Sequence, residues 1–129
     1  MAATRPKPDF DAHQRAIRSP FRAVAAELRD LLGARLVAYI GGVQNTRAVR
    51  EWATGDRAPS QEEQQRLRLA LQVALLIASA DDNEIAQAWF QGVNPQLDDR
   101  SPARMLRDGA LNEAGPAVVA AARAFLVGG

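Results

Sequence analysis

The chain is organised around residues 89–109, which read WFQGVNPQLDDRSPARMLRDG. The first half predicts the end of a helix, because Trp89 and Phe90 continue an apolar helical face and Gly92 and Pro95 stop it. The second half predicts a short helix that Ser101 caps. Pro102 stands at its first position, where the missing N–H costs nothing. An ordered loop is expected between the two helices.

Upstream, apolar residues recur at helical spacing from Phe21 to Leu32, after a Ser19-Pro20 start signal, and Gly33 closes this helix. A second short helix carries Leu36, Val37, Tyr39 and Ile40, and Gly41-Gly42 breaks it. Asn45 then caps a third helix that runs through Thr54. Two short helices joined by a glycine-containing turn are typical of a helix-turn-helix unit.

The third helix of this unit predicts a DNA-binding surface. Its inward face is Ala48, Val49 and Trp52, and its outward face includes Arg47 and Arg50. A guanidinium group can donate two hydrogen bonds to a guanine edge in the major groove. The expected DNA-binding residues are Asn45, Thr46, Arg47, Arg50 and Arg57. A homodimer on a palindromic operator is expected, because one unit of this size binds weakly. The alternative is a three-helix core that does not bind DNA.

The second half of the chain predicts further helices. Ser60 and Glu63 form a capping box before a long helix, about residues 61–78, which is apolar on nearly all sides from Leu69 onward. We expect this helix to be central to the bundle and to contribute a subunit or partner contact. Asp81 with Glu84 predicts the next cap, and Gly115-Pro116 predicts the start of the last helix.

Composition excludes several classes of protein. There is no cysteine and one histidine, His13, so we expect no disulfide, no metal site and no cofactor. The serines fall at predicted helix caps and ends, and no base accompanies the paired carboxylates, so we expect no enzyme. No apolar run approaches the roughly 18 residues of a membrane helix, and no signal peptide opens the chain. We therefore expect a cytoplasmic protein without a membrane partner.

Charge is unevenly distributed along the chain. Residues 1–60 carry ten Arg and Lys against six Asp and Glu, a balance of +4, whereas residues 61–129 carry six against nine, a balance of −3. The basic half suits a polyanion and the acidic half suits a protein partner.

The stretch at 89–109 resembles the C-terminal domain of the Xre/MbcA/ParS family, the antitoxins of RES-domain toxins. The resemblance lies in Trp89, Phe90, Asn94, Pro95, Leu97, Ser101, Pro102, Met105 and Leu106. Residues 52–59 also resemble the end of helix-turn-helix units of the Xre group. On the residues alone, a helix–loop–helix corner of any all-α domain is the alternative.

The resemblance implies an all-α helical bundle and a type II antitoxin that neutralises a cognate RES-domain toxin and represses its own operon. Those toxins are similar to ADP-ribosyltransferases and degrade NAD⁺. The implied toxin contacts are Asn94, Leu97, Arg100, Arg104, Met105, Arg107, Phe125, Leu126, Val127, Gly128 and Gly129. The expected organisation is a flexible arm (1–18), a helix-turn-helix-like unit (19–60) and a toxin-binding domain (61–129) that share one core. A stand-alone dimeric transcriptional regulator is the alternative function.

Overall fold

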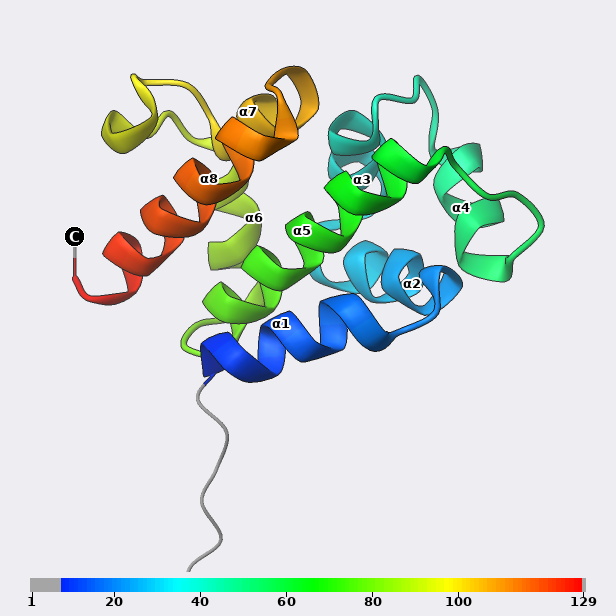
Figure 1. The fold of residues 1–129 in the computed structure, drawn as a ribbon, viewed down its shortest axis with the longest axis horizontal. Helices are drawn as coiled ribbons and strands as arrows, with labels where there is room; N and C mark the ends of the chain where they lie inside the picture. Colours follow the sequence, from blue (N-terminus) through cyan, green and yellow to red (C-terminus); the bar gives the residue numbers. More distant parts are fainter. Residues whose placement is uncertain (1–7, 129) are drawn as a thin grey trace, which may run out of the picture.

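A computed structural model of the chain describes residues 8–128, which form an all-α bundle, as predicted (Figure 1). The elements are α1 (Pro8–Arg18), α2 (Phe21–Leu32), α3 (Ala34–Gly41), α4 (Thr46–Thr54), α5 (Gln61–Ala78), α6 (Asn83–Gln91), the 3₁₀ turn η1 (Pro95–Leu97), α7 (Pro102–Asp108) and α8 (Leu111–Leu126). Within these residues, no helix combines the length and the apolar character needed to cross a membrane.

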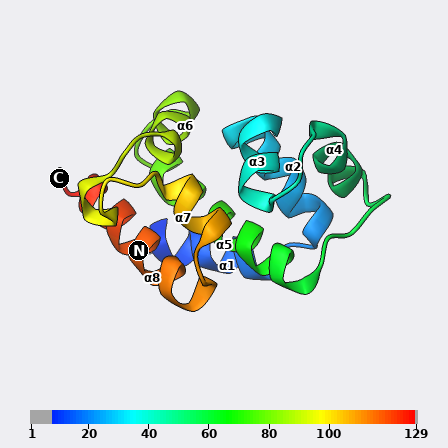
Figure 2. The same cartoon turned by 90° about the horizontal axis from the view of Figure 1, so that it is seen from above.

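Helix α5 is the centre of the bundle. The predicted capping box is present, because the Ser60 side chain accepts from the Glu63 N–H and the Glu63 carboxylate accepts from the Ser60 N–H. Other helices of the same chain surround α5: α1, α2 and α3 pack against part of its surface and α6, α7 and α8 against the rest (Figures 1 and 2). This enclosure explains why its sequence is apolar beyond one face.

Helices α2, α3 and α4 lie within residues 19–60, for which a helix-turn-helix-like unit was predicted. Trp52 is 1% exposed and its ring centroid lies 6.3 Å from that of Phe21. Gly41 allows this packing, since a Cβ there would lie 2.9 Å from the Trp52 ring. Gly33 and Asn45 act as predicted, at the end of α2 and as the cap of α4. The predicted Ser19 cap is wrong: Pro20 is the N-cap residue of α2, with no side-chain cap bond.

The predicted flexible arm is wrong for residues 8–18, which form helix α1. Ala12 and Ala16 are buried, and Arg68 of α5 donates to the carbonyls of Ala16 and Ser19 at 2.9 and 2.7 Å. Pro8 stands at the first position of α1, where a helix tolerates proline, so it does not signal an unstructured segment. Residues 1–7 of the predicted arm lie outside the described residues.

The far end of α1 is tied to α8. Asp9 accepts a hydrogen bond of 2.7 Å from Arg123. This bond and the charge of Asp9 raise the pKa of Arg123 above its ordinary value. Arg123 therefore stays protonated at any physiological pH.

Two predicted helix starts in the second half are also wrong. Asp82, not Asp81, caps α6, accepting from the Ile85 N–H at 2.9 Å. Helix α8 begins at Leu111, so Pro116 lies inside it. Gly115 has a different role from a helix break, because a Cβ there would lie 3.0 Å from a Leu69 methyl group. The glycine lets α8 approach α5 closely.

Candidate functional site

The loop between α6 and α7 is held by its own backbone and by Asn94. The Asn94 side chain accepts from the Gln96 N–H at 2.9 Å, and its carbonyl accepts from Leu97 and Asp99. Leu97 is 4% exposed. Two of the predicted toxin contacts, Asn94 and Leu97, therefore shape the loop and anchor it, and neither offers its side chain freely to a partner.

Helix α7 follows as the sequence predicted. The Ser101 hydroxyl accepts from the Arg104 N–H at 3.1 Å, and Pro102 stands at the first position. Leu106 is fully buried and fixes the helix on the core. On its other sides, α7 presents Arg104 and Arg107 to two different surface hollows.

The first of these, the α7/α8 hollow, brings three predicted toxin contacts together. It has a volume of about 250 Å³. Its lining is Arg100, Arg104, Met105, Asp108, Gly109, Ala110, Glu113 and Ala114. The lining carries both signs of charge, and Met105 is its half-buried apolar member. The side chains of Arg100 and Arg104 are 49% and 62% exposed. Exposed arginines around an apolar side chain are typical of protein–protein contact surfaces.

Arg107 lies elsewhere. Its guanidinium group stacks 4.5 Å from the centroid of the Tyr39 ring, and Nη1 donates to the Tyr39 carbonyl at 3.4 Å. It lines a second hollow of about 340 Å³, the α3/α7 hollow. That lining is Arg35, Ala38, Tyr39, Val43, Gln44, Asn45, Thr46 and Arg107. The structure thus separates Arg107 from the arginines with which the sequence analysis grouped it.

The end of α8 forms a third part of the predicted toxin surface. The Phe125 ring lies 6.4 Å from the Trp89 ring, and Phe125 and Leu126 are both half-buried. Val127 is 87% exposed, and Gly128 adopts a positive φ of 92°. Gly129 lies outside the described residues. Val127 and Gly128 are therefore the described members of the tip that a partner can reach without disturbing the core.

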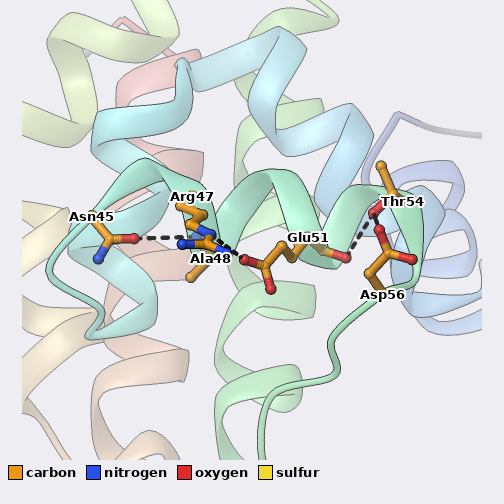
Figure 3. Close-up of polar contacts among 6 residues, drawn as sticks. All are labelled: Asn45, Arg47, Ala48, Glu51, Thr54 and Asp56. Atoms are coloured by element: carbon orange, nitrogen blue, oxygen red, sulfur yellow. Dashed lines mark hydrogen bonds and ion pairs between the residues drawn. The ribbon is translucent and has the colours of Figure 1, made fainter.

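The predicted DNA-binding residues are exposed on α4 and at its two ends. Figure 3 shows two of them, Asn45 and Arg47. The Asn45 side chain accepts from the Ala48 N–H at 3.3 Å. The Arg47 side chain is 77% exposed and donates to Glu51 at 2.9 Å. Arg50 is exposed and, within residues 8–128, makes no ion pair. Thr46 and Arg57 are exposed as well.

Sequence reasoning did not single out Arg35 and Tyr39 as site residues. Tyr39 was grouped with the apolar positions of its helix, but it is 37% exposed. Its four-residue spacing from Arg35 places both on one face of α3. The sequence alone could therefore have shown that Arg35 and Tyr39 share a face of α3. The sequence could not have shown that α7 packs against this face. Among the described residues, no group of three potential metal ligands comes together.

Comparison with known proteins supports the class that these features define. No protein-family model matches the chain, and no curated protein matches it. Among solved structures, it matches a chain of the M. tuberculosis MbcT–MbcA toxin–antitoxin complex, with 25% sequence identity and a TM-score of 0.63. The match covers 82% of this chain and 96% of that chain.

The match covers most of both chains, so it shows that the two share an all-α fold, and it supports an antitoxin role for this chain. The likeness supports an MbcA-like antitoxin family for this chain.

Proposed function

We propose that the chain is an antitoxin that binds and neutralises a cognate RES-domain, NAD⁺-degrading toxin. The observation that carries this proposal is the likeness, over 82% of this chain and 96% of the other, to a chain of a toxin–antitoxin complex. The role is one of binding in the cytoplasm and not of catalysis. The RES class of the toxin rests on the resemblance of residues 89–109 to the family pattern.

The α7/α8 hollow is the proposed centre of the toxin surface. Arg100 and Arg104 offer guanidinium groups that can pair with carboxylates of the toxin, and Met105 offers an apolar contact between them. The rigid loop and the capped helix hold these side chains in place, so little ordering entropy is lost on binding. Val127 and Gly128 form a second contact at the other end of α8.

The test is co-expression with a RES-domain toxin from the same organism, with bacterial growth and cellular NAD⁺ as readouts. The Arg100→Ala/Arg104→Ala variant should bind the toxin about 30-fold or more weakly, since hot-spot truncations cost about 2 kcal/mol or more. Arg29→Ala on α2 is the matched control for loss of an arginine and should neutralise normally. Full protection by the double variant would remove the α7/α8 hollow from the toxin surface.

A truncation tests the end of the chain, residues 127–129, independently of the α7/α8 hollow. Removing residues 127–129 deletes the exposed end while leaving Phe125 against Trp89. The truncated chain should keep its melting temperature and lose part of its affinity for the toxin. Unchanged neutralisation by the truncated chain would contradict a role for the tip.

Repression of its own operon by a homodimer is the second part of the proposal. The exposed arginines of α4 support it, because they lie on the outward helix of a helix-turn-helix-like unit. Arg50→Ala should weaken operator binding more than Arg47→Ala, since Glu51 already neutralises part of the Arg47 charge. A stand-alone regulator would show the same DNA binding but no toxin partner, and co-purification from the native host distinguishes the two.

A further inference from the structure

The α3/α7 hollow presents positive charge. Two arginines, Arg35 and Arg107, line it from different helices. None of its eight lining residues is acidic. The α7/α8 hollow, on the other side of the same helix, contains both Asp108 and Glu113. The α3/α7 hollow therefore presents positive charge without a carboxylate among its lining residues.

Nearby carboxylates neutralise this charge only in part. Asp108 lies 3.7 Å from Arg107, but it lies equally close to Arg104, so one carboxylate is shared by two guanidinium groups. Arg35 is exposed and makes no ion pair within residues 8–128. An excess of positive charge therefore remains at the hollow.

Tyr39 holds Arg107 in place. The guanidinium group lies against the ring face and donates to the backbone carbonyl of the same residue. This leaves other N–H donors of the guanidinium group unused, and its side chain is 36% exposed. A positioned guanidinium group suits the two acceptor oxygens of a phosphate.

The hollow also adjoins the start of α4. Asn45 and Thr46, both predicted to bind DNA, are among its lining residues. The hollow is therefore continuous with the start of the outward face of α4, along which a duplex would lie. DNA backbone is accordingly the occupant that the charge and the position together favour over an acidic protein.

We propose that the DNA-binding surface extends across the α3/α7 hollow, where Arg35 and Arg107 contact backbone phosphates beside the groove that α4 faces. This inference rests on the DNA-binding part of the proposed function. It assigns Arg107 to DNA, although the residue lies on the helix that also presents Arg104 to the toxin. Helix α7 then serves both partners with arginines three residues apart.

The experiment measures the affinity of the full-length chain for a short mixed-sequence duplex as a function of salt, by fluorescence anisotropy. Phosphate contacts do not depend on sequence, so the operator need not be known. Each phosphate contact contributes about −0.9 to the slope of log K against log salt. Arg107→Ala and Arg35→Ala should each reduce the slope by about 0.9, and the double variant by about twice as much.

Two comparisons separate charge from structure. Arg107→Lys should retain the slope, whereas Arg107→Met, which keeps an extended side chain without charge, should lose as much as Arg107→Ala. Arg123→Ala also removes one cation, but on α8, at the opposite end of the bundle from α4 (Figures 1 and 2). It should leave the slope unchanged, and circular dichroism melts should show that all variants are folded.

The outcomes distinguish this inference from the function on which it rests. A normal slope in both Arg107→Ala and Arg35→Ala, with a reduced slope in Arg50→Ala, would overturn the inference and leave DNA binding by α4 intact. Loss of toxin affinity in Arg107→Ala with an unchanged DNA slope would assign the hollow to the toxin. Absence of duplex binding by the unmodified chain, even at low salt, would overturn both.

Discussion

The two hollows beside α7 differ in chemistry although one short helix lines both. The α7/α8 hollow joins Arg100 and Arg104 to acidic residues and to Met105, as a protein interface does. The α3/α7 hollow joins Arg107 to Arg35 and to the start of α4, with no acidic lining residue. Arginines on one helix can thus belong to surfaces for partners of opposite character, and the neighbouring helix decides which.

Helix geometry alone does not separate these arginines. Residues three apart differ by only about 60° around a helix, so Arg104 and Arg107 are ordinarily treated as neighbours on one face. Here α8 packs on one side of α7 and α3 on the other. Arg104 and Arg107 therefore line different hollows, although both lie 3.7 Å from Asp108.

The largest effect should come from removing the anchor that both hollows share. Leu106 is fully buried on the inner side of α7. Leu106→Ala should lower the free energy of unfolding by about 2–5 kcal/mol, as for other buried leucines. Urea unfolding measures this loss, and both DNA and toxin binding should weaken together.

Val127→Ala is the control for this prediction, because it also shortens an aliphatic side chain but at a position that is 87% exposed. It should change the free energy of unfolding by less than about 0.5 kcal/mol. An equally small change in Leu106→Ala would mean that α7 does not depend on this contact for its position.

The second prediction should affect one hollow only. A Cβ on Gly109 would lie 2.7 Å from the Met105 carbonyl oxygen and 2.9 Å from the Ala114 Cβ. Gly109→Ala should therefore push α7 and α8 apart and cost about 1–3 kcal/mol. Toxin affinity should fall, whereas the salt slope of DNA binding should stay normal.

Gly92→Ala is the matched control, since Gly92 also follows a helix with an extended backbone, at φ −82° against −83° for Gly109. The added Cβ would lie 3.2 Å from the Ala88 carbonyl and contact no other element. It should destabilise the chain less. A larger loss in Gly92→Ala would contradict the steric explanation.

What the sequence could predict depended on whether a feature is determined by neighbours in the sequence or by contacts between helices. Local signals predicted the Ser101 cap, the Ser60 capping box and the Asn45 cap, because each depends on side chains within three residues. Tertiary contacts produced the errors. Gly115-Pro116 was wrongly predicted to start the last helix, which begins at Leu111. The sequence does not reveal that Gly115 packs on Leu69. The stacking of Arg107 on Tyr39 was not predictable either, because the approach of Tyr39 depends on the whole fold, and a toxin contact at Arg107 stays a prediction.

The third prediction concerns the cap that presents both arginines. Ser101→Ala removes the acceptor for the Arg104 N–H and should cost about 1 kcal/mol. Because α7 has only seven residues, this loss should fray its first turn and weaken toxin binding before DNA binding. Ser60→Ala removes a cap from the longer helix α5 and should lower stability by a similar amount without a selective effect on the toxin. Equal losses of toxin affinity in the two variants would contradict a local role for Ser101.

The smallest effect should come from neutralising Glu51, an acidic residue on the α4 face; the α3/α7 hollow has no acidic lining residue. Glu51 pairs with Arg47, and it is part of the outward side of α4. Glu51→Gln should cost about 0.3–0.5 kcal/mol of folding stability through loss of an i, i+4 ion pair. It should also strengthen duplex binding a few-fold at low salt, because Arg47 is then free to meet a phosphate.

Glu62→Gln makes the same change in net charge at a second i, i+4 pair, that of Glu62 with Arg66 on α5. A gain confined to Glu51→Gln would show that the duplex lies along α4 and that Glu51 limits the contribution of Arg47. An equal increase in duplex affinity in both variants would show that the affinity depends only on the net charge of the chain. The α3/α7 hollow, whose lining residues include no carboxylate, would then be the better-defined part of the DNA surface.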